Sequence, residues 1–385
     1  EFFGPHGPAL LILVLPAVVY GLFLACNQAD CLSVWPTLHI PSSLKALPES
    51  LTLFSWEAMG VFGAWFGGLA LLHLILPGKR VQGAPLPDGS RLTYKLNGAL
   101  RNGTLKAMSV YWPHLQAQWE GAMLSGHGSS GYPWYDFWMG RELNPRTGTF
   151  DWKEFCEMYP GLIGWVIINL GMAHKQYMDI GRVTNSMVLV NAFQLYYVVD
   201  ALWNEPSILS TMDITTDGFG YMLAFGDLAW VPFVFSCSSR YLADYPMDLS
   251  AAGVAAVLAV KLLGYYIFRG ANGQKDTFRR NPDHPSVAHL KTMPTTRGTK
   301  LIISGWWGMS RHINYLGDWI MGVAWCMPCG LAGLYSIIPY FYCIYFATLL
   351  IHRERRDDAA CRKKYGRDWD KYCAMVKYRI VPYVY

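Results

Sequence analysis

Acidic and basic side chains crowd the stretch Leu350–Gly366, LIHRERRDDAACRKKYG, which follows a long apolar run. Asp357 and Asp358 lie there among six bases: Arg353, Arg355, Arg356, Arg362, Lys363 and Lys364. A basic cluster beside a membrane segment can be a simple cytoplasmic stop signal. However, a second basic stretch, Lys275–Lys300, also follows a hydrophobic segment. Because Arg and Lys recognise phosphate by charge and forked hydrogen bonds, we expect both stretches to form one phosphate-binding basin at the membrane face.

Polar side chains recur at helical spacing in and just after the apolar stretch Ser186–Trp203. Steps of three or four residues separate Asn191, Gln194, Tyr197, Asp200 and Asn204, so a helix presents them on one face. Polar groups are costly in lipid, and this face should point into the bundle or a cavity. Either these groups hydrogen-bond neighbouring helices, or they orient a largely apolar ligand, with a tyrosine hydroxyl as a candidate proton donor.

Four acids flank or enter the hydrophobic segment that follows: Glu205, Asp213, Asp217 and Asp227. Ionisable residues at membrane depth indicate function, and apolar surroundings raise the pKa of a carboxyl group. Such a group could protonate an alkene. The alternative is a set of helix caps and interhelical hydrogen bonds, which we expect for Asp213 and Asp217.

A third polar cluster spans Ser304–Asp318, SGWWGMSRHINYLGD. An aromatic belt at a membrane surface explains the pair Trp306 and Trp307. It does not explain the accompanying polar residues Arg311, His312, Asn314, Tyr315 and Asp318. Stacking combined with hydrogen bonding would suit a nucleotide.

Composition favours a polytopic membrane protein. The 385 residues are 52% hydrophobic and 15% charged, with 16 Trp and 24 Tyr, as expected of membrane spans with aromatic belts. The net charge of +5 is modest and gathered in a few loops, so nucleic-acid binding is not expected. The nine Cys show no even disulfide spacing, and the motif Cys326–Cys329 lies in an apolar run, where packing explains it. No cleavable signal peptide is recognisable.

Apolar runs near the 20 or so residues that cross a bilayer divide the chain into about eight segments. They are Ala9–Cys26, Leu51–Leu76, Gly161–Ala173, Ser186–Trp203, Tyr221–Cys237, Ala251–Phe268 and Leu316–Ile351, the last long enough for two spans that turn near Cys329, Gly330 and Gly333. Residues 77–130 are polar and turn-rich, and Leu105–Leu124 is a poor spanning segment. Residues 270–300 and 352–385 carry the Lys and Arg excess and should face the cytoplasm.

The expected fold is therefore all-α, a polytopic transmembrane helix bundle of about 8–10 spans with a cytoplasm-facing C-terminal cofactor region. Several familiar sites are absent from the sequence. It has no GxGxxG after a strand and no Walker A loop. It has no HExxH or paired CxxC for a metal and no GxSxG nucleophile.

Two long motifs resemble signatures of the sterol reductase family. Gly131–Arg146, GYPWYDFWMGRELNPR, is similar to the first, and Leu349–Gly366 contains the second, HRxxRDxxxCxxKYG. The family includes sterol Δ14-, Δ7- and Δ24(28)-reductases and the sterol reductase region of the lamin B receptor. The segment Ser210–Phe233, STMDITTDGFGYMLAFGDLAWVPF, resembles the corresponding segment of the Δ14 branch.

This resemblance implies NADPH-dependent reduction of the C14=C15 double bond of a sterol intermediate in ergosterol or cholesterol biosynthesis, in the endoplasmic reticulum membrane. The implied catalytic residues are Tyr197 and Asp357. The implied nucleotide contacts are Lys275, Arg279, Ile302, Trp307, Asn314, Tyr315, Asp357, Cys361, Arg362, Lys363, Lys364, Tyr365 and Tyr372. The expected sterol contacts are Gln194, Trp203, Glu205 and Asp227. The partners are thus a sterol and membrane lipid, with no metal and no nucleic acid.

The resemblance also implies a division into two regions. Residues 1–130 would form an N-terminal transmembrane region, and residues 131–385 the catalytic region with its NADPH and sterol pockets. Family members carry about two more spans where this chain has the short region 99–130. Three alternatives stay open. The protein could reduce a Δ7 or Δ24(28) bond, or it could be a non-catalytic sterol-binding membrane protein. It could also have a related methyltransferase fold, which shares the motif RHxNYLGD. A transporter is disfavoured, because no pair of interrupted helices occupies matching halves.

Overall fold

Helices form most of the chain in the computed structural model, which describes residues 4–385 apart from 5, 35–36, 46–53, 77, 87–88, 97–122, 127, 149 and 331–335. The chain divides into two compact units. Unit 1 comprises Glu1–Val183 and Asn191–Tyr245, and unit 2 comprises Thr184–Val190 and Pro246–Tyr385. The functional boundary at residue 130 stays a prediction, and most of the region 99–130 and of Leu105–Leu124 lies outside the described residues.

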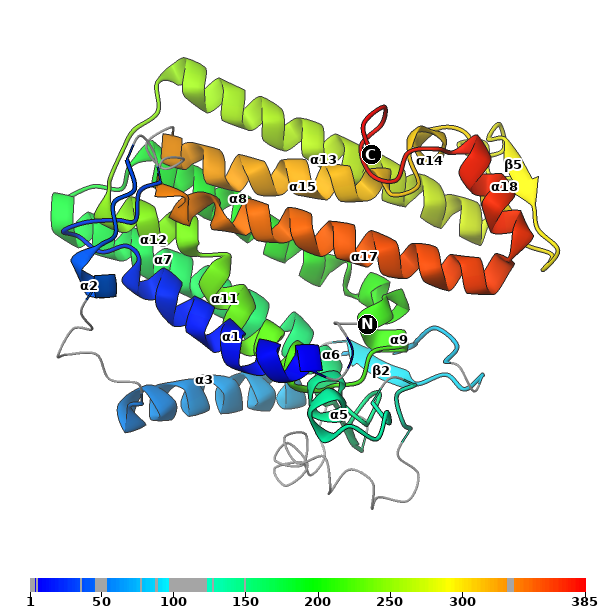
Figure 1. Ribbon diagram of the computed structural model, residues 1–385, viewed down its shortest axis with the longest axis horizontal. Helices are drawn as coiled ribbons and strands as arrows, with labels where there is room; N and C mark the ends of the chain where they lie inside the picture. The colour runs from blue at the N-terminus through cyan, green and yellow to red at the C-terminus, as the bar shows by residue number, and fades with distance from the viewer. Residues whose placement is uncertain are drawn as a thin grey trace. The chain divides into compact units, whose positions relative to one another are not determined.

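Unit 1 consists of helices with short two-stranded sheets. Its longer helices are α1 (His6–Leu24), α3 (Trp56–Ile75), α7 (Pro160–Ile180), most of α8 (Asn185–Trp203) and α12 (Cys237–Asp244). The shorter ones are α2 (Ser42–Lys45), α5 (Pro133–Met139), α6 (Trp152–Met158), η2 (Glu205–Ser210), α9 (Met212–Thr215), α10 (Tyr221–Phe225), the π-helical η3 (Gly226–Trp230) and α11 (Val231–Val234). Antiparallel pairs join β1 (Lys79–Gln82) to β2 (Thr93–Leu96) and β3 (Arg146–Thr147) to β4 (Phe150–Asp151). Helix α7 packs against α11 and α12 (Figure 1).

Local sequence explains where several of these helices begin and pack. Ser55 caps α3 by accepting a hydrogen bond from the Ala58 amide (3.3 Å), and Asp151 caps α6 in the same way through the Glu154 amide (3.0 Å). An aromatic core built around Phe155 then joins α6 to α3, whose Phe66 ring meets Phe155 edge-on at 5.5 Å.

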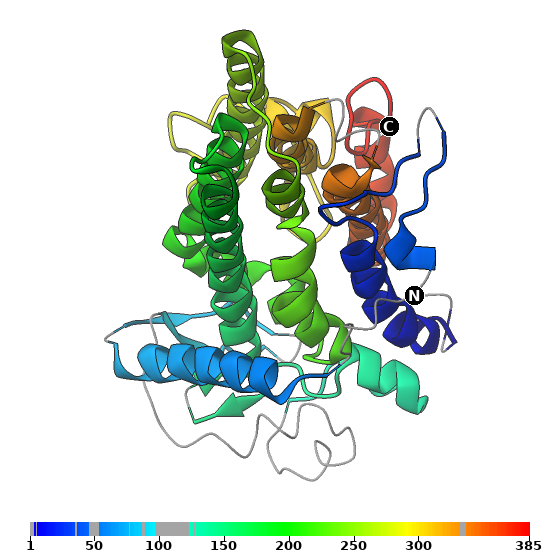
Figure 2. The same ribbon diagram turned by 90° about the vertical axis from the view of Figure 1, so that its left-hand side faces the viewer.

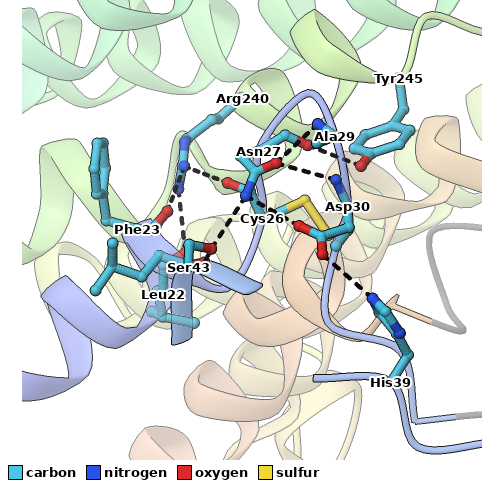
Figure 3. The surroundings of a disulfide bond; sticks show 12 residues. Leu22, Phe23, Cys26, Asn27, Ala29, Asp30, His39, Ser43, Arg240 and Tyr245 are labelled. Atoms are coloured by element: carbon cyan, nitrogen blue, oxygen red, sulfur yellow. Dashed lines mark hydrogen bonds and ion pairs between the residues drawn. A yellow bond between two sulfur atoms is a disulfide. The ribbon is translucent and has the colours of Figure 1, made fainter. Parts of the chain in front are cut away.

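A disulfide between Cys26 and Cys31 closes the loop after α1, which the sequence analysis did not predict. Arg240 of α12 holds this loop by donating hydrogen bonds to the carbonyl groups of Phe23 and Cys26, each at 2.6 Å (Figure 3). The Tyr245 hydroxyl donates to a further carbonyl of the loop, that of Asn27 (2.8 Å). A guanidinium group suits the carbonyls that a helix C-terminus leaves unpaired. The disulfide loop therefore lies at the C-terminal end of α12.

Unit 2 is built on three helices that lie side by side, α13 (Ala251–Arg280), α15 (Ile313–Cys326) and α17 (Phe341–Tyr365). Figure 1 shows smaller elements gathered where α13 and α17 end, and Figure 2 views the same helices from their other end. These elements are the hairpin of β5 (Thr292–Pro294) and β6 (Lys300–Ile302), α14 (Trp306–Met309) and α18 (Arg367–Met375). The short turns η4 (Met327–Cys329) and η5 (Ile338–Tyr340) lie between α15 and α17 in sequence.

The predicted fold class is confirmed. Six helical segments among the described residues are long and apolar enough to cross a membrane: His6–Leu24, Trp56–Ile75, Trp152–Ile180, Asn185–Trp203, Tyr221–Asp244 and Ala251–Arg280. Each of them overlaps one of the first six predicted segments. Cys326 and Cys329 are buried free thiols, in keeping with a packing role.

Two predicted boundaries differ from the structure. Helix α13 continues to Arg280, so Lys275 and Arg279 lie on its last turns and not after it. The sequence missed this because the apolar pattern stops at Phe268 while a polar, solvated helix carries on. The predicted pair of spans in Leu316–Ile351 corresponds to α15, which has only 14 residues, and to the apolar half of α17. The expected turn residue Gly333 lies outside the described residues.

Helices α13 and α15 cross at two glycines that allow close backbone contact. A Cβ atom built on Gly264 would lie 2.8 Å from the Gly317 carbonyl oxygen, and one on Gly317 would lie 2.6 Å from the Phe268 amide nitrogen. Real Cβ atoms do not approach other atoms so closely. Small residues are typical of such helix contacts in membranes.

We predict that Gly264→Ala destabilises the protein by about 1–3 kcal/mol, because the added methyl group forces the two backbones apart. Gly273→Ala on the same helix is the matched control, since its Cβ would meet no atom within 4 Å. The control should be neutral or stabilising by up to about 1 kcal/mol, from helix propensity. Thermal unfolding in detergent measures the stability of both variants. Equal unfolding temperatures for Gly264→Ala and Gly273→Ala would contradict the close contact of α13 and α15.

Candidate functional site

The two basic stretches meet at one end of unit 2. The Thr296 amide in the β5–β6 turn donates to Asp368 Oδ2 on α18 (2.7 Å). The Arg297 guanidinium donates to the Lys364 carbonyl oxygen at the end of α17 (3.3 Å). The turn between the strands therefore lies on the junction of α17 and α18. The predicted convergence of Lys275–Lys300 with Leu350–Gly366 is confirmed.

Asp357 on α17 is the centre of a small hydrogen-bonded group. The Tyr315 hydroxyl donates to Asp357 Oδ2 (2.8 Å), and His312 Nδ1 lies 3.9 Å from the same oxygen. The His312 and Tyr315 rings stack with their centroids 4.8 Å apart. Burial, together with the charges of Lys275 and Arg311, lowers the pKa of His312 to about 3. His312 is therefore neutral at physiological pH and contacts Asp357 without a charge.

Lys275 lies over an indole ring on the same end of the unit. Its ammonium nitrogen is 3.9 Å from the centroid of the Trp307 ring, a cation–π contact. The buried Trp307 donates its Nε1 hydrogen to the Ala271 carbonyl oxygen (2.8 Å), which fixes the ring against α13. Lys275 also interacts electrostatically with Arg279, Asp357 and Cys361. The helix ends thus bring a cation, an aromatic face and a carboxylate together.

Asn314 offers a hydrogen-bond acceptor at this end of unit 2. Its Nδ2 donates to Asn272 Oδ1 (3.3 Å), and its own Oδ1 is buried with no hydrogen-bond partner among the described residues. An acceptor buried without a partner costs free energy. A ligand that donates a hydrogen bond to Asn314 Oδ1 would remove that cost.

Basic side chains form an exposed rim at the end of α17. Lys363, Lys364 and Arg362 are all exposed, and the Arg362 guanidinium pairs with Asp370 and with Asp358 Oδ2 (3.5 Å). Arg279 is exposed as well. The cations of this rim could contact phosphate oxygens, although Arg362 is already paired with two carboxylates and the Lys364 ammonium lies 5.1 Å from the centroid of the Tyr365 ring.

Four further predicted nucleotide contacts contribute mainly packing. Ile302 is buried in the core around Trp307, and Tyr372 is buried beside Trp369. The Tyr365 ring stacks on Trp369 with centroids 6.3 Å apart. Cys361 packs against the same cluster, and burial raises the pKa of its thiol to about 11. The thiol is therefore protonated and a poor nucleophile at physiological pH.

Two of the residues singled out on α8 lie in unit 1, at the contact with α7. Gln194 is buried, and its Oε1 accepts hydrogen bonds from Trp165 Nε1 (2.8 Å) and Asn169 Nδ2 (2.5 Å). Its Nε2 donates to the Phe235 carbonyl oxygen (3.0 Å). This geometry is the interhelical hydrogen bonding that the sequence offered as one alternative. The Tyr197 ring lies 6.1 Å from the Trp165 ring.

The acids of unit 1 have different surroundings. Glu205 is buried, accepts a hydrogen bond from the Tyr159 hydroxyl and contacts Glu154, and burial raises its pKa. Asp227 lies in the π-helical turn η3, and its buried Oδ2 has no hydrogen-bond partner among the described residues. Trp203 is 85% exposed, so it does not line a site enclosed by protein.

Lys153 is a buried residue that sequence reasoning missed. Its ammonium group donates to the carbonyl oxygens of Asp213 (2.5 Å), Ile214 (3.2 Å) and Asp217 (2.7 Å). It thereby fixes the loop on which two of the predicted acids lie. A lysine in a short amphipathic stretch carries no sequence signal for this role.

The chain is similar to several known proteins along its whole length. A family model described as the Ergosterol biosynthesis ERG4/ERG24 family matches residues 15–119 and 103–385. The Delta(14)-sterol reductase erg24 of Schizosaccharomyces pombe is 47% identical over 421 residues, covering 100% of this chain and 97% of the relative. The Delta(14)-sterol reductase TM7SF2 of Mus musculus is 46% identical over 419, with the same coverage. The Delta(14)-sterol reductase LBR of Gallus gallus is 46% identical over 416, covering 98% of this chain and 63% of the relative.

We predict that His312 makes the protein less stable in acid. The unfolded histidine takes up a proton below about pH 6.5 and the folded one only near pH 3. Between these values the unfolded state binds more protons, so the free energy of unfolding falls as the pH falls, by up to about 1.4 kcal/mol per pH unit. Between pH 7 and pH 5, the unfolding temperature of His312→Asn should therefore fall less than that of the wild type. An equal loss in both proteins would contradict the neutral histidine.

Proposed function

Because the chain belongs to the Ergosterol biosynthesis ERG4/ERG24 family, we propose that it is a Δ14-sterol reductase that uses NADPH to reduce the C14=C15 double bond of a sterol. The names of three relatives that align with at least 98% of this chain support the reaction. The end of unit 2 described above would hold the nucleotide. Tyr197 and Asp357 are the proposed catalytic residues.

The fit of unit 2 to a dinucleotide is the observation that carries the cofactor proposal. Trp307 offers a flat aromatic face beside the Lys275 cation, and Asn314 Oδ1 is an acceptor that has no donor among the described residues. The exposed bases Arg279, Lys363 and Lys364 suit phosphate oxygens. Ile302, Cys361 and Tyr372 would support this surface from behind, and Tyr365 and Arg362 would lie at its rim.

The chemistry requires a proton as well as a hydride. NADPH, when bound, supplies the hydride. An isolated C=C bond is a poor hydride acceptor, so a proton must arrive first or in concert, and protonation of the less substituted carbon leaves the positive charge at the tertiary C14. Tyr197 is the proposed donor of this proton, and its place on the partly polar face of α8 supports the role. Asp357 would hold Tyr315 and His312 in place through the 2.8 Å hydrogen bond and the 3.9 Å contact.

The sterol contacts proposed in unit 1 fall into two groups. Glu205 is buried, and the Oδ2 of Asp227, which has no hydrogen-bond partner among the described residues, could accept a hydrogen bond from a sterol hydroxyl group. Gln194 would act by holding α7 and α8 together, since its amide is already hydrogen-bonded to three partners. Trp203, being exposed, would contact lipid or an incoming sterol at the membrane surface.

We further propose that the protein lies in the endoplasmic reticulum membrane with its nucleotide site facing the cytoplasm. Disulfides persist in oxidising compartments such as the lumen of this organelle, and the Cys26–Cys31 loop is bound to the end of α12. Six residues separate α12 from α13, and at about 3.5 Å each they are too few to cross an apolar layer of about 30 Å. Helix α13 would thus begin on the lumenal side and, being about 45 Å long, end in the cytoplasm at Arg280.

We predict that Asp357→Ala abolishes Δ14 reduction while the protein still inserts into the membrane. The side chain contacts both Tyr315 and His312, so its loss frees both rings. The test is sterol analysis by mass spectrometry after expression in cells that lack Δ14 reduction. Wild-type protein should restore Δ14-reduced sterols and the variant should not. A normal sterol profile with the variant would refute the role of Asp357, and a Δ7 or Δ24(28) product from the wild type would refute the proposed bond.

A second prediction concerns the nucleotide. Lys275→Met should raise the dissociation constant for NADPH about tenfold or more, because it removes a cation held in place by Trp307. Arg280→Gln is the control, since Arg280 is exposed and its guanidinium pairs with Asp276 one turn earlier on the same helix (3.1 Å). Titration of purified protein with NADPH measures both constants. Equal NADPH affinities of Lys275→Met and the wild type would contradict the placement of the cofactor beside Lys275.

A further inference from the structure

Glu354 is a buried carboxylate on the same face of α17 as Asp357. The two residues are three positions apart, so one turn of the helix separates them. Glu354 has no exposed surface, and a buried charge of this kind must be paired. Its partner is Arg379, whose Nη1 donates to Glu354 Oε2 (2.9 Å) and Oε1 (3.3 Å). The Tyr385 hydroxyl approaches the same carboxylate at 3.4 Å.

Arg379 belongs to the segment 376–385, which is hydrogen-bonded to residues 310–312. The His312 amide donates to the Arg379 carbonyl oxygen (2.8 Å), and the Arg311 amide donates to the Tyr378 carbonyl oxygen (2.9 Å). The Ser310 hydroxyl donates to the Ile380 carbonyl oxygen (2.8 Å). The position of the backbone at His312 therefore depends on the segment 376–385.

Two further sets of contacts fix this segment. The Tyr385 carbonyl oxygen accepts hydrogen bonds from the amides of Arg379 (2.8 Å) and Ile380 (2.9 Å), so the segment folds back on itself. The buried Arg311 side chain donates to the carbonyl oxygen of Val376 (2.9 Å) and lies 4.0 Å from Glu354 Oε1. Glu354 is thus the acid shared by Arg379 and Arg311.

These contacts form a closed loop through the proposed nucleotide site. It runs from Glu354 to Arg379, then through the backbone to His312, whose ring stacks on Tyr315, and from Tyr315 to Asp357 on the helix that also carries Glu354. We propose that Glu354 and Arg379 are positioning residues for nucleotide binding, and that they act through the segment 376–385 on His312 and Tyr315. This inference rests on the proposed function, because it assigns the site of unit 2 to NADPH.

A different result is expected if the ion pair of Glu354 and Arg379 only stabilises the fold. Its loss would lower the unfolding temperature and leave the affinity of the folded protein for NADPH unchanged. A positioning pair acts on the nucleotide affinity itself, and it should not act on the affinity for the sterol. Supporting groups behind metal ligands change affinity by about 10- to 100-fold, and we expect an effect at the lower end of this range.

The test compares four variants with the wild type by titration with NADPH and with a Δ14-unsaturated sterol. Arg379→Met and Glu354→Gln should each raise the dissociation constant for NADPH about tenfold, with little change for the sterol. Arg379→Lys keeps the charge and should lose only about threefold. Arg280→Gln, which alters an exposed ion pair of the same kind, should change neither constant.

An unchanged NADPH affinity in folded Arg379→Met or Glu354→Gln would overturn the proposal. If neither variant folds, Arg379→Lys decides, because an affinity equal to that of the wild type then shows that the pair is structural only. Absence of NADPH binding to the wild-type protein would instead refute the proposed function. The two failures are therefore distinguishable.

Discussion

Every charged side chain buried in an apolar helix bundle needs a partner, and this constraint organises unit 2. Water cannot stabilise these charges, and an isolated buried ion is very costly. Glu354 and Arg311 are buried, Lys275 covers an indole ring, and Asp357 holds a tyrosine hydroxyl. Each of these pairings joins two elements that are distant in the sequence. The contacts that make the end of unit 2 polar therefore also hold its elements together.

The same constraint has a different outcome in unit 1. Lys153 uses backbone carbonyl groups, and Glu205 uses a tyrosine hydroxyl. The buried Oδ2 of Asp227 has no hydrogen-bond partner among the described residues, and it lies in a π-helical turn. Turns of this type interrupt regular helices and are frequent at functional sites. Lys153, Glu205 and Gln194 thus use their polar groups to hold elements of unit 1 together.

Much of the fold and part of the candidate site could be predicted from the sequence. Apolar runs located the six spanning segments, and the charge pattern indicated that two basic stretches meet, since both follow hydrophobic segments. The contacts of Glu354 and Lys153 could not be predicted, because their partners are a guanidinium 25 residues further along and carbonyl groups some 60 residues further along, which no local spacing encodes. The disulfide was missed because two closely spaced cysteines among nine carry no pattern of their own.

The most direct test of this account is a structure of the protein bound to NADPH, determined by electron cryo-microscopy in detergent or nanodiscs. The account predicts nucleotide density against Trp307 and Asn314, with its phosphates near Arg279, Lys363 and Lys364. Density for the nucleotide at any other part of the molecule would contradict it.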